Sequence, residues 1–331
     1  MRTIVLPDIH GEPGPLNTAL EAAGCLKRAG QWTLDPRKKF ALLTLGDTTG
    51  RGKQNRKVME VMLRLRQQLG PLFTMLVGNH CIAREIALRE GGMEQILRWM
   101  EGSNTSIIAE FGKTRGCRVR NGTTAFTDFF KKYPPSEDDN KRWNALTQKH
   151  PELLERDFQK SLLAAKQFFT RKDVAALFDN ARLVHPMGDV LAAHAGINLI
   201  AAELLRSNGV NGVNLAFREC INKNDLQAVA SGDLSGVTWM RRDQESGRLL
   251  DPTISDTIKY HGFQALIRGH DAQSDGRQRV AMENGILEID ADTDMWQWNA
   301  SFVEVDDDTG RIRTWNQEQG WRVVRAAGWS G

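Results

Sequence analysis

Five short apolar runs rich in strand-forming residues constrain the fold of this chain more than any other feature. They read TIVL, FALLTL, LFTMLV, DVLAA and FQALI, and they cover residues 3–6, 40–45, 72–77, 189–193 and 263–267. Strands that are apolar along their whole length are typical of sheets covered on both faces. Helical patterns lie between several of the runs, and this alternation indicates an α/β protein built in layers.

The segments between these runs carry helix signals. NRKVMEVMLRLRQQLG places its apolar residues largely on one side and ends at a glycine. From about residue 84 to residue 181 strand signals are absent, so we expect a helical cap inserted over about residues 101–181 within a single domain of residues 1–331. After residue 271, Asn-Gly and Asp-Thr-Gly turns predict hairpins and therefore a β-rich C-terminal segment.

Each of the five runs is followed within a few residues by side chains that commonly bind metals. Two aspartates, one asparagine and four of the seven histidines hold these positions: Asp8, His10, Asp47, Asn79, His80, His194 and His270. In open α/β sheets, sites form outside the carboxyl ends of strands, so we expect these residues to converge and interpret them as one polynuclear metal site. His150, His185 and His261 lack this placement and are interpreted as structural.

The types of ligand restrict the metal. Carboxylate, amide and imidazole donors without thiolate suit manganese, iron or zinc, and the set is too rich in nitrogen for calcium. An aspartate that bridges two ions gives the two-metal arrangement used to hydrolyse phosphate esters. The four cysteines are scattered and form no CxxC pair, which argues against a zinc ribbon or a disulfide framework.

The motifs PDIHG, GDTTGRG, GNH, HAG and GHD, in this order, resemble the five signature blocks of the calcineurin-like metallophosphoesterases. The D-x-H-G and R-G details resemble the phosphoprotein phosphatase branch. The long helical stretch between GNH and HAG, with VTWMRR before the last block, is most similar to the bacterial Shewanella-like phosphatases. The resemblance spans residues 8–271 and implies an αββα sandwich of two mixed β-sheets flanked by helices.

The resemblance also implies a role for each motif residue. It implies that Asp8 and His10 bind the first metal and that Asp47 bridges the two metals. Asn79, His194 and His270 would bind the second metal. Two divalent ions, Mn²⁺ by preference with iron or zinc as alternatives, would supply a metal-bound hydroxide that attacks phosphorus in line. The final block reads GHD rather than GHxH, so the first metal would complete its shell with water there.

Catalysis and phosphate binding would fall to side chains beside the metals. His80 would protonate the leaving oxygen, and it would contact the substrate phosphate together with Asn79. Arg51 would hold two phosphoryl oxygens at once, because a guanidinium is planar and bidentate. A second arginine normally joins it; Arg241 in TWMRR is our choice, and its neighbour Arg242 is the rival.

Two positions depart from the phosphatase branch. Gly50 stands where that branch usually carries the aspartate that orients the proton-donating histidine. Its loss should leave His80 less well held. Cys81 stands where an acidic residue is usual, and we interpret it as structural because no base other than His80 is indicated beside it.

These motifs predict a dinuclear metal-dependent hydrolase of phosphomonoesters, and a protein phosphatase (Ser/Thr or Tyr) is the favoured interpretation. Its substrate would be a phosphorylated protein or a small phosphoester. One alternative is a symmetrical dinucleoside tetraphosphatase, which shares AHAGI and the missing aspartate, although the segment between His80 and His194 is too long for that pattern. A second alternative, suggested by Gly50 and Cys81, is a weakly catalytic metal-dependent module that binds phosphate.

Charge and hydropathy exclude other classes of partner. The net charge of +3 and the absence of a basic aromatic patch give no support for nucleic acid. No run approaches the roughly 20 apolar residues of a membrane span, and the apolar IVL near the N-terminus is too short for a signal peptide. We therefore expect a cytoplasmic protein with no membrane partner.

Overall fold

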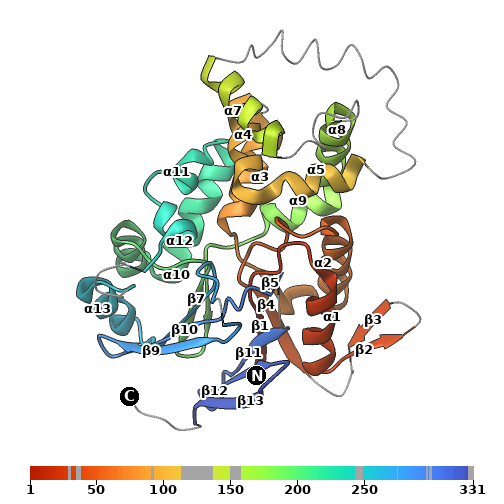
Figure 1. The fold of residues 1–331 in the computed structure, drawn as a ribbon. Coiled ribbons are helices and arrows are strands. Elements are labelled where there is room, and N and C mark those ends of the chain that lie inside the picture. Colours follow the sequence, from red (N-terminus) through yellow and green to blue (C-terminus); the bar gives the residue numbers. More distant parts are fainter. Residues whose placement is uncertain are drawn as a thin grey trace.

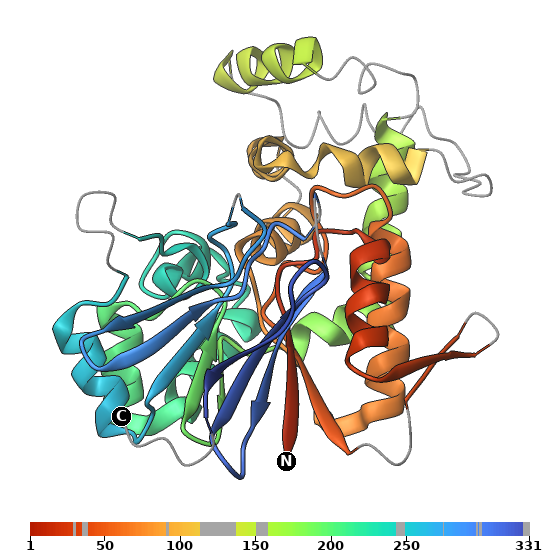
Figure 2. The same cartoon turned by 60° about the horizontal axis from the view of Figure 1, so that its bottom comes forward.

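Two mixed β-sheets lie face to face at the centre of this computed structural model, and helices cover their outer faces (Figures 1 and 2). The structure describes residues 1–28, 31–34, 39–90, 93–112, 137–149, 158–242, 249–273, 275–295, 297 and 300–326. The predicted αββα sandwich is confirmed.

The first sheet has six strands in the order β13-β12-β11-β1-β4-β5. Their bounds are β1 (Arg2–Leu6), β4 (Phe40–Thr44), β5 (Phe73–Met75), β11 (Ser301–Asp306), β12 (Arg311–Asn316) and β13 (Gly320–Arg325). The three N-terminal strands come from the first three predicted runs and are parallel, with Ile4 opposite Leu42. The C-terminal hairpins continue the sheet on the other side of β1, where β11 is antiparallel to β1.

The second sheet has five strands in the order β6-β7-β8-β10-β9. Their bounds are β6 (Val184–Met187), β7 (Val190–Ala193), β8 (Ala265–Arg268), β9 (Arg279–Glu283) and β10 (Ile286–Asp290). Strands β7, β8 and β10 are parallel. The β9–β10 hairpin turns at Asn284 and Gly285, whose φ angles of 51° and 79° are those that a two-residue type I′ turn requires.

The two faces of each central strand pack against different partners. Ile4 and Leu6 of β1 belong to the core between the first sheet and its helices. Val5, between them, belongs to a second core with Leu43 and with Ile289 of the other sheet. Burying such a side chain contributes about 1.5–3 kcal/mol, so strands that bury both faces are apolar at every position.

Helices flank the sandwich on both sides. On the first sheet lie α1 (Pro13–Ala22) and α2 (Asn55–Leu69), and on the second lie α10 (Leu199–Asn222) and α13 (Pro252–Tyr260), as Figure 2 shows. Two short helices, α11 (Gln227–Ala230) and α12 (Ser235–Trp239), follow α10. Helix α2 buries its predicted apolar side and ends before Gly70, whose φ is 56°. No helix in the described residues is long and apolar enough to span a bilayer.

Between β5 and β6 the described residues form helices. These are α3 (Asn79–Glu90), α4 (Met93–Trp99), the π-helical turn η2 (Met100–Asn104), α5 (Thr105–Gly112), α7 (Glu137–Lys149), α8 (Phe158–Phe169) and α9 (Lys172–Asp179). In Figure 2, α4, α5 and α7 lie above one end of the sandwich. The described parts of the predicted cap, residues 101–112, 137–149 and 158–181, fall in this segment, and the rest of residues 101–181 lies outside the described residues.

Two strand pairs depart from the expectation. Strand β6 contains Pro186 and pairs only with β7 at the edge of its sheet, where a residue without an N–H is tolerated. The separate hairpin of β2 (Cys25–Arg28) and β3 (Gln31–Leu34) stands apart from both sheets (Figure 1). Strands β2, β3 and β6 lack the continuous apolar run by which the central strands were predicted, whereas β7, the partner of β6, carries the predicted run DVLAA.

Candidate metal centre

The predicted metal ligands converge at the carboxyl ends of strands from both sheets. They follow β1, β4, β5, β7 and β8, and each is at most 8% exposed: Asp8, His10, Asp47, Asn79, His194 and His270. All but His194 line a cavity of about 200 Å³. His194 is fully buried. The two sheets thus bring together residues that are up to 262 positions apart.

Asp47 occupies the centre of this arrangement. The donor atoms of Asp8, Asp47 and His194 lie within 4.8 Å of one another. Those of His10, Asp47 and His80 do so as well, so Asp47 belongs to both groups. A carboxylate shared by two ligand groups is what a bridge between two ions requires.

The two oxygens of Asp47 have different surroundings. Oδ1 accepts hydrogen bonds from the backbone N–H groups of His80 at 3.0 Å and Cys81 at 3.3 Å, at the start of α3. Oδ2 lies 3.5 Å from His194 Nε2 and has no hydrogen-bond partner in the described part of the chain. The N-terminus of α3 therefore fixes the carboxylate, and the second oxygen stays available for a cation.

Asn79, His194 and His270 form the second part of the centre. His194 donates from Nδ1 to the carbonyl oxygen of Leu45 at 2.8 Å, which leaves a lone pair on Nε2. His194 Nε2 lies 3.1 Å from Asn79 Oδ1, which is itself an acceptor. His270 Nδ1 also lies 3.1 Å from Asn79 Oδ1. Two acceptors that face each other at this distance fit a shared cation.

Three of the six predicted ligands have a left-handed backbone. The φ angles are 49° at His10, 37° at Asp47 and 72° at His270. Such a conformation costs a residue with a side chain about 1–2 kcal/mol. Backbone strain of this kind is characteristic of functional sites, where surrounding structure holds it in place. Here the sharp turns after β1, β4 and β8 direct the ligands into the cavity.

Gly78 makes room for the bridge. A Cβ atom at this position would lie 2.1 Å from Asp47 Oδ1 and 2.7 Å from His194 Cε1. Neither group could easily move aside, because both side chains are fully buried. The glycine in GNH is therefore required by the close packing of Asp47 and His194 against the backbone.

Charges within the cavity favour a bound cation. Burial, and then the neighbouring carboxylates of Asp292 and Asp47, raise the pKa of Asp8 well above its usual range. Burial, and then His80, lower the pKa of His10, which keeps its imidazole neutral as metal binding requires. Burial raises the pKa of Asp47 as well, but the surrounding imidazoles and backbone N–H groups outweigh it and the net shift is downward.

Buried polar atoms without hydrogen-bond partners indicate that the site fits metal ions. Asp8 Oδ1, His10 Nδ1 and Asp47 Oδ2 are buried without a hydrogen-bond partner within the described residues. Leaving such groups unsatisfied is costly in a protein interior. Divalent ions would satisfy them, so the residues present fit the metals that the donor set predicts.

Asp292 is a cavity residue that the sequence motifs did not identify. It follows β10, is 3% exposed, and lines the cavity together with Asp8, His10 and Asp47. Burial raises its pKa to about 7. Its position, two residues after a buried parallel strand, matches that of Asp8 after β1 and was the available signal. In the sequence, this aspartate belongs to a segment that resembles an incomplete calcium-binding loop.

The arginines near the site divide into two groups. Arg51, Arg98 and Arg241 line the cavity. Arg242 forms ion pairs with Glu283 and Glu288, away from the cavity lining. Asp271, the last residue of GHD, pairs with Arg268 at 3.0 Å. Of the two rival arginines, Arg241 is thus the one that lines the cavity.

The loop that carries Arg51 is held from two sides. Asn55 accepts a hydrogen bond from Gly50 N and donates one to Gly52 O, both at 2.7 Å. Ser106 in α5 donates to Gly50 O at 2.8 Å. Glu110, also in α5, accepts from the backbone N–H of Asn55 at 2.7 Å and so caps the start of α2. The inserted helices therefore support the loop.

The remaining sequence predictions concern side chains outside the centre. Burial raises the pKa of Cys81 to about 11, so its thiol stays protonated and is a poor nucleophile at neutral pH. His185 and His261 lie outside the cavity lining, and Arg182 contacts His185 at 3.1 Å. His150 lies outside the described residues.

Comparisons with known proteins agree with this architecture. The model of the calcineurin-like phosphoesterase family matches residues 1–274. A cold-active protein-tyrosine phosphatase from a psychrophilic Shewanella species has a similar fold, with a TM-score of 0.59 and 15% identity over 98% of this chain and 80% of that one. A further structure of a cold-active protein tyrosine phosphatase has a TM-score of 0.57 and 17% identity, over 98% of this chain and 78% of that one. Among curated proteins there is no significant match.

Proposed function

This chain belongs to the calcineurin-like phosphoesterase family, as its five motifs predicted, and on that premise we propose that it is a dinuclear metal-dependent phosphomonoesterase acting on phosphorylated proteins. Hydrolysis of phosphoesters follows from the family. The observation that carries the finer proposal is the position of Asp47, which belongs to two ligand groups beside a cavity lined by Arg51 and Arg241.

Six residues would hold the two ions: Asp8, His10, Asp47, Asn79, His194 and His270. When bound, divalent ions supply a nucleophile from water at neutral pH and positive charge beside the phosphoryl oxygens. Manganese suits the mixture of carboxylate, amide and imidazole donors, with iron and zinc as alternatives.

The chain's own cationic side chains would bind the phosphoryl group. Arg51 and Arg241 line the cavity, and each guanidinium can donate two parallel hydrogen bonds to phosphoryl oxygens. This holds phosphorus in one orientation relative to the ligands. His80 and Asn79 line the same cavity, and His80 would donate a proton to the leaving oxygen.

The size of the cavity limits what it holds. Its volume of about 200 Å³ is below the roughly 300–1,000 Å³ of a pocket that encloses a whole small ligand. It suits a phosphoryl group and the first atoms of the leaving group, so the rest of the substrate would lie outside it. A phosphorylated side chain could enter such a cavity while the protein that carries it stays outside.

The cellular setting is part of the same proposal. Cys81 and Cys220 are free thiols, which suits a reducing compartment such as the cytoplasm.

Hydrolysis of an aryl phosphate by chelated and reloaded protein tests the proposed function. We expect two equivalents of Mn²⁺ to bind and activity to return with them. Asp47→Asn should lower kcat at least 100-fold and reduce the stoichiometry of bound metal. Purified protein that binds no divalent ion, or an Asp47→Asn variant with unchanged activity, would contradict the proposal. A weakly catalytic phosphate-binding module would bind metal and phosphate with no turnover.

A further inference from the structure

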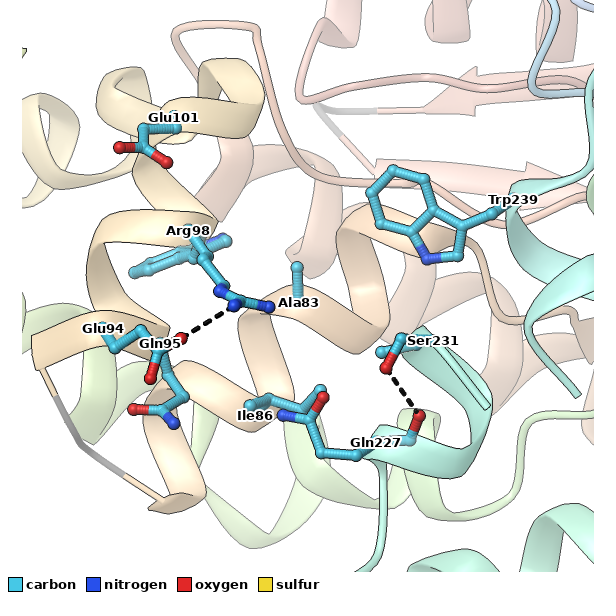
Figure 3. Close-up of a pocket in the computed structure, with 11 residues that line it drawn as sticks. Ala83, Ile86, Glu94, Gln95, Arg98, Glu101, Gln227, Ser231 and Trp239 are labelled. Carbon is cyan, nitrogen blue, oxygen red and sulfur yellow. Dashed lines mark hydrogen bonds and ion pairs between the residues drawn. The ribbon is translucent and has the colours of Figure 1, made fainter. Parts of the chain in front are cut away.

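A second cavity, of about 660 Å³, opens beside the metal cavity. The two share Ala83, Arg98 and Trp239 in their linings, so they adjoin each other. Helices α3 and α4 form one wall, and α11, with the start of the following turn, forms another (Figure 3). A group bound in the metal cavity would therefore lie next to this second cavity.

The lining of the second cavity combines apolar side chains with neutral and charged polar ones. Ala83, Ile86 and Ala230 contribute aliphatic surface, and Trp239, which is 43% exposed, presents its indole from the opposite side (Figure 3). Gln227 is among the polar residues, together with Gln95 and Ser231. Amides and hydroxyls of this kind can hydrogen-bond a peptide backbone.

The charges in the lining disfavour a polyanion. Among the described residues that line this cavity, Glu94 and Glu101 are acidic and Arg98 is basic. Arg98 forms an ion pair with Glu94 at 2.7 Å, and Glu101 pairs with Arg142. Because each carboxylate is already paired with an arginine, the lining offers no excess positive charge to the chain of phosphates in a dinucleoside polyphosphate. A neutral, partly apolar group does not need such charge.

We propose that this second cavity binds the polypeptide that flanks the phosphorylated residue, and that it selects an apolar side chain next to that residue. The proposal rests on the proposed phosphatase function and names the class of substrate. The phosphoryl group would lie among Arg51, Arg241 and the metal ligands. The neighbouring apolar side chain would pack against Ile86, Ala230 and the face of Trp239.

A peptide panel tests the selectivity of the unaltered holoenzyme. Phosphopeptides with leucine, alanine or aspartate on either side of the phosphorylated residue would be compared with diadenosine tetraphosphate and an aryl phosphate. We expect kcat/KM to be about tenfold higher for leucine than for alanine, and lower still for aspartate. Equal rates for the three peptides, or a preference for the dinucleotide, would overturn the proposal.

Ala230→Phe fills part of the cavity without altering a residue of the metal cavity. It should lower kcat/KM for the leucine peptide about tenfold, mainly through KM, and leave hydrolysis of the aryl phosphate within about twofold. Ala176→Phe is the matched control, because Ala176 lines a separate cavity of about 620 Å³ between α2 and α9. Equal loss of peptide activity in the two variants would contradict the proposal.

The same series separates this inference from the proposed function. If the aryl phosphate were not hydrolysed with any metal, the phosphatase function would fail. Calorimetric binding of the unphosphorylated leucine and aspartate peptides would then still decide whether the cavity selects apolar polypeptide. Tighter binding of the leucine peptide, weakened by Ala230→Phe, supports it; no difference overturns it.

Discussion

Ser106 in helix α5 donates a hydrogen bond of 2.8 Å to the carbonyl oxygen of Gly50, the residue before Arg51. The inserted helices are thereby tied to the loop that would grip the phosphoryl group. The contact is made by a backbone carbonyl and does not use a side chain at residue 50.

Removing this bond should affect both stability and substrate binding. For Ser106→Ala we expect a loss of about 1 kcal/mol in the free energy of unfolding and a several-fold increase in KM for an aryl phosphate. Ser255→Ala removes a comparable bond, from its hydroxyl to Asp251 O at 3.1 Å in the remote helix α13. That control should lose stability without a change in KM. Equal KM values for the two variants would show that the insertion does not position Arg51.

Substitutions of Gly50 test whether an added carboxylate would orient His80. We expect Gly50→Asp to raise kcat about tenfold if the new carboxylate holds the His80 ring. Gly50→Asn has nearly the same shape without the charge and should give no such gain. Steady-state rates with an aryl phosphate would distinguish the two. A rate in Gly50→Asp no higher than in Gly50→Asn would mean that His80 is already well positioned.

Gly78→Ala should disrupt the metal centre. The added methyl group would overlap Asp47 Oδ1 and the His194 ring, so the ligands must separate. We expect metal affinity to fall at least tenfold and the free energy of unfolding to drop by about 1–3 kcal/mol. Gly14→Ala in helix α1 is the control, since nothing lies within 4 Å of its Cβ position. That change should leave metal binding unaltered and stabilise the helix slightly.

Asp292 should strengthen the attraction of the cavity for metal. Its carboxylate is the neighbouring charge that acts most strongly on Asp8, so Asp292→Asn removes negative potential where a cation would bind. We expect the affinity for Mn²⁺ to fall about tenfold, measured by calorimetric titration of chelated protein. Asp256→Asn, on the exposed side of α13, should leave it unchanged. Unaltered affinity in Asp292→Asn would restrict this residue to a structural role.

Stability should fall in weakly acidic solution because of His185. Burial, and then the Arg182 guanidinium, lower the pKa of His185 to about 4. Arg182 can only donate, so its contact at 3.1 Å needs a lone pair on His185 Nδ1. Between the unfolded pKa of about 6.5 and the folded pKa, the unfolded chain binds a proton that the folded chain excludes.

The free energy of unfolding should therefore decrease as the pH falls through this window, by about 3 kcal/mol at most, and level off below pH 4. Denaturant titrations at pH 7 and pH 5 would measure the loss. His185→Gln should remove most of it, because glutamine accepts a hydrogen bond without titrating. An identical loss in both proteins would assign the acid sensitivity to other groups.

The central strands and the candidate ligands were predicted from the sequence for a common physical reason. Strands buried on both faces must be apolar throughout, and polar residues directly after them stand out against that background. Asp47 and His270 were recognisable in this way. Asp292 was not, because β10 belongs to a hairpin whose alternating pattern hides the end of a parallel strand.

Other features depend on contacts that local sequence does not encode. Arg241 and Arg242 are neighbours of the same type, and only the ion pairs of Arg242 with Glu283 and Glu288 separate their surroundings. The support of the Arg51 loop by Ser106 joins residues 56 positions apart. The second cavity likewise depends on how α4 packs near α11, which no motif indicates.

The contact between Asp8 and His270 also bears on how the protein is made. His270 N donates to Asp8 Oδ2 at 3.2 Å across 262 residues of chain. A ribosome releases the first ligand early and the last one only after most of the polypeptide has emerged. Until then, a nascent chain exposes carboxylates and imidazoles that have no complete set of partners. If His194 and His270 hold the second ion as proposed, that ion would be bound late in biosynthesis, after the second sheet has formed.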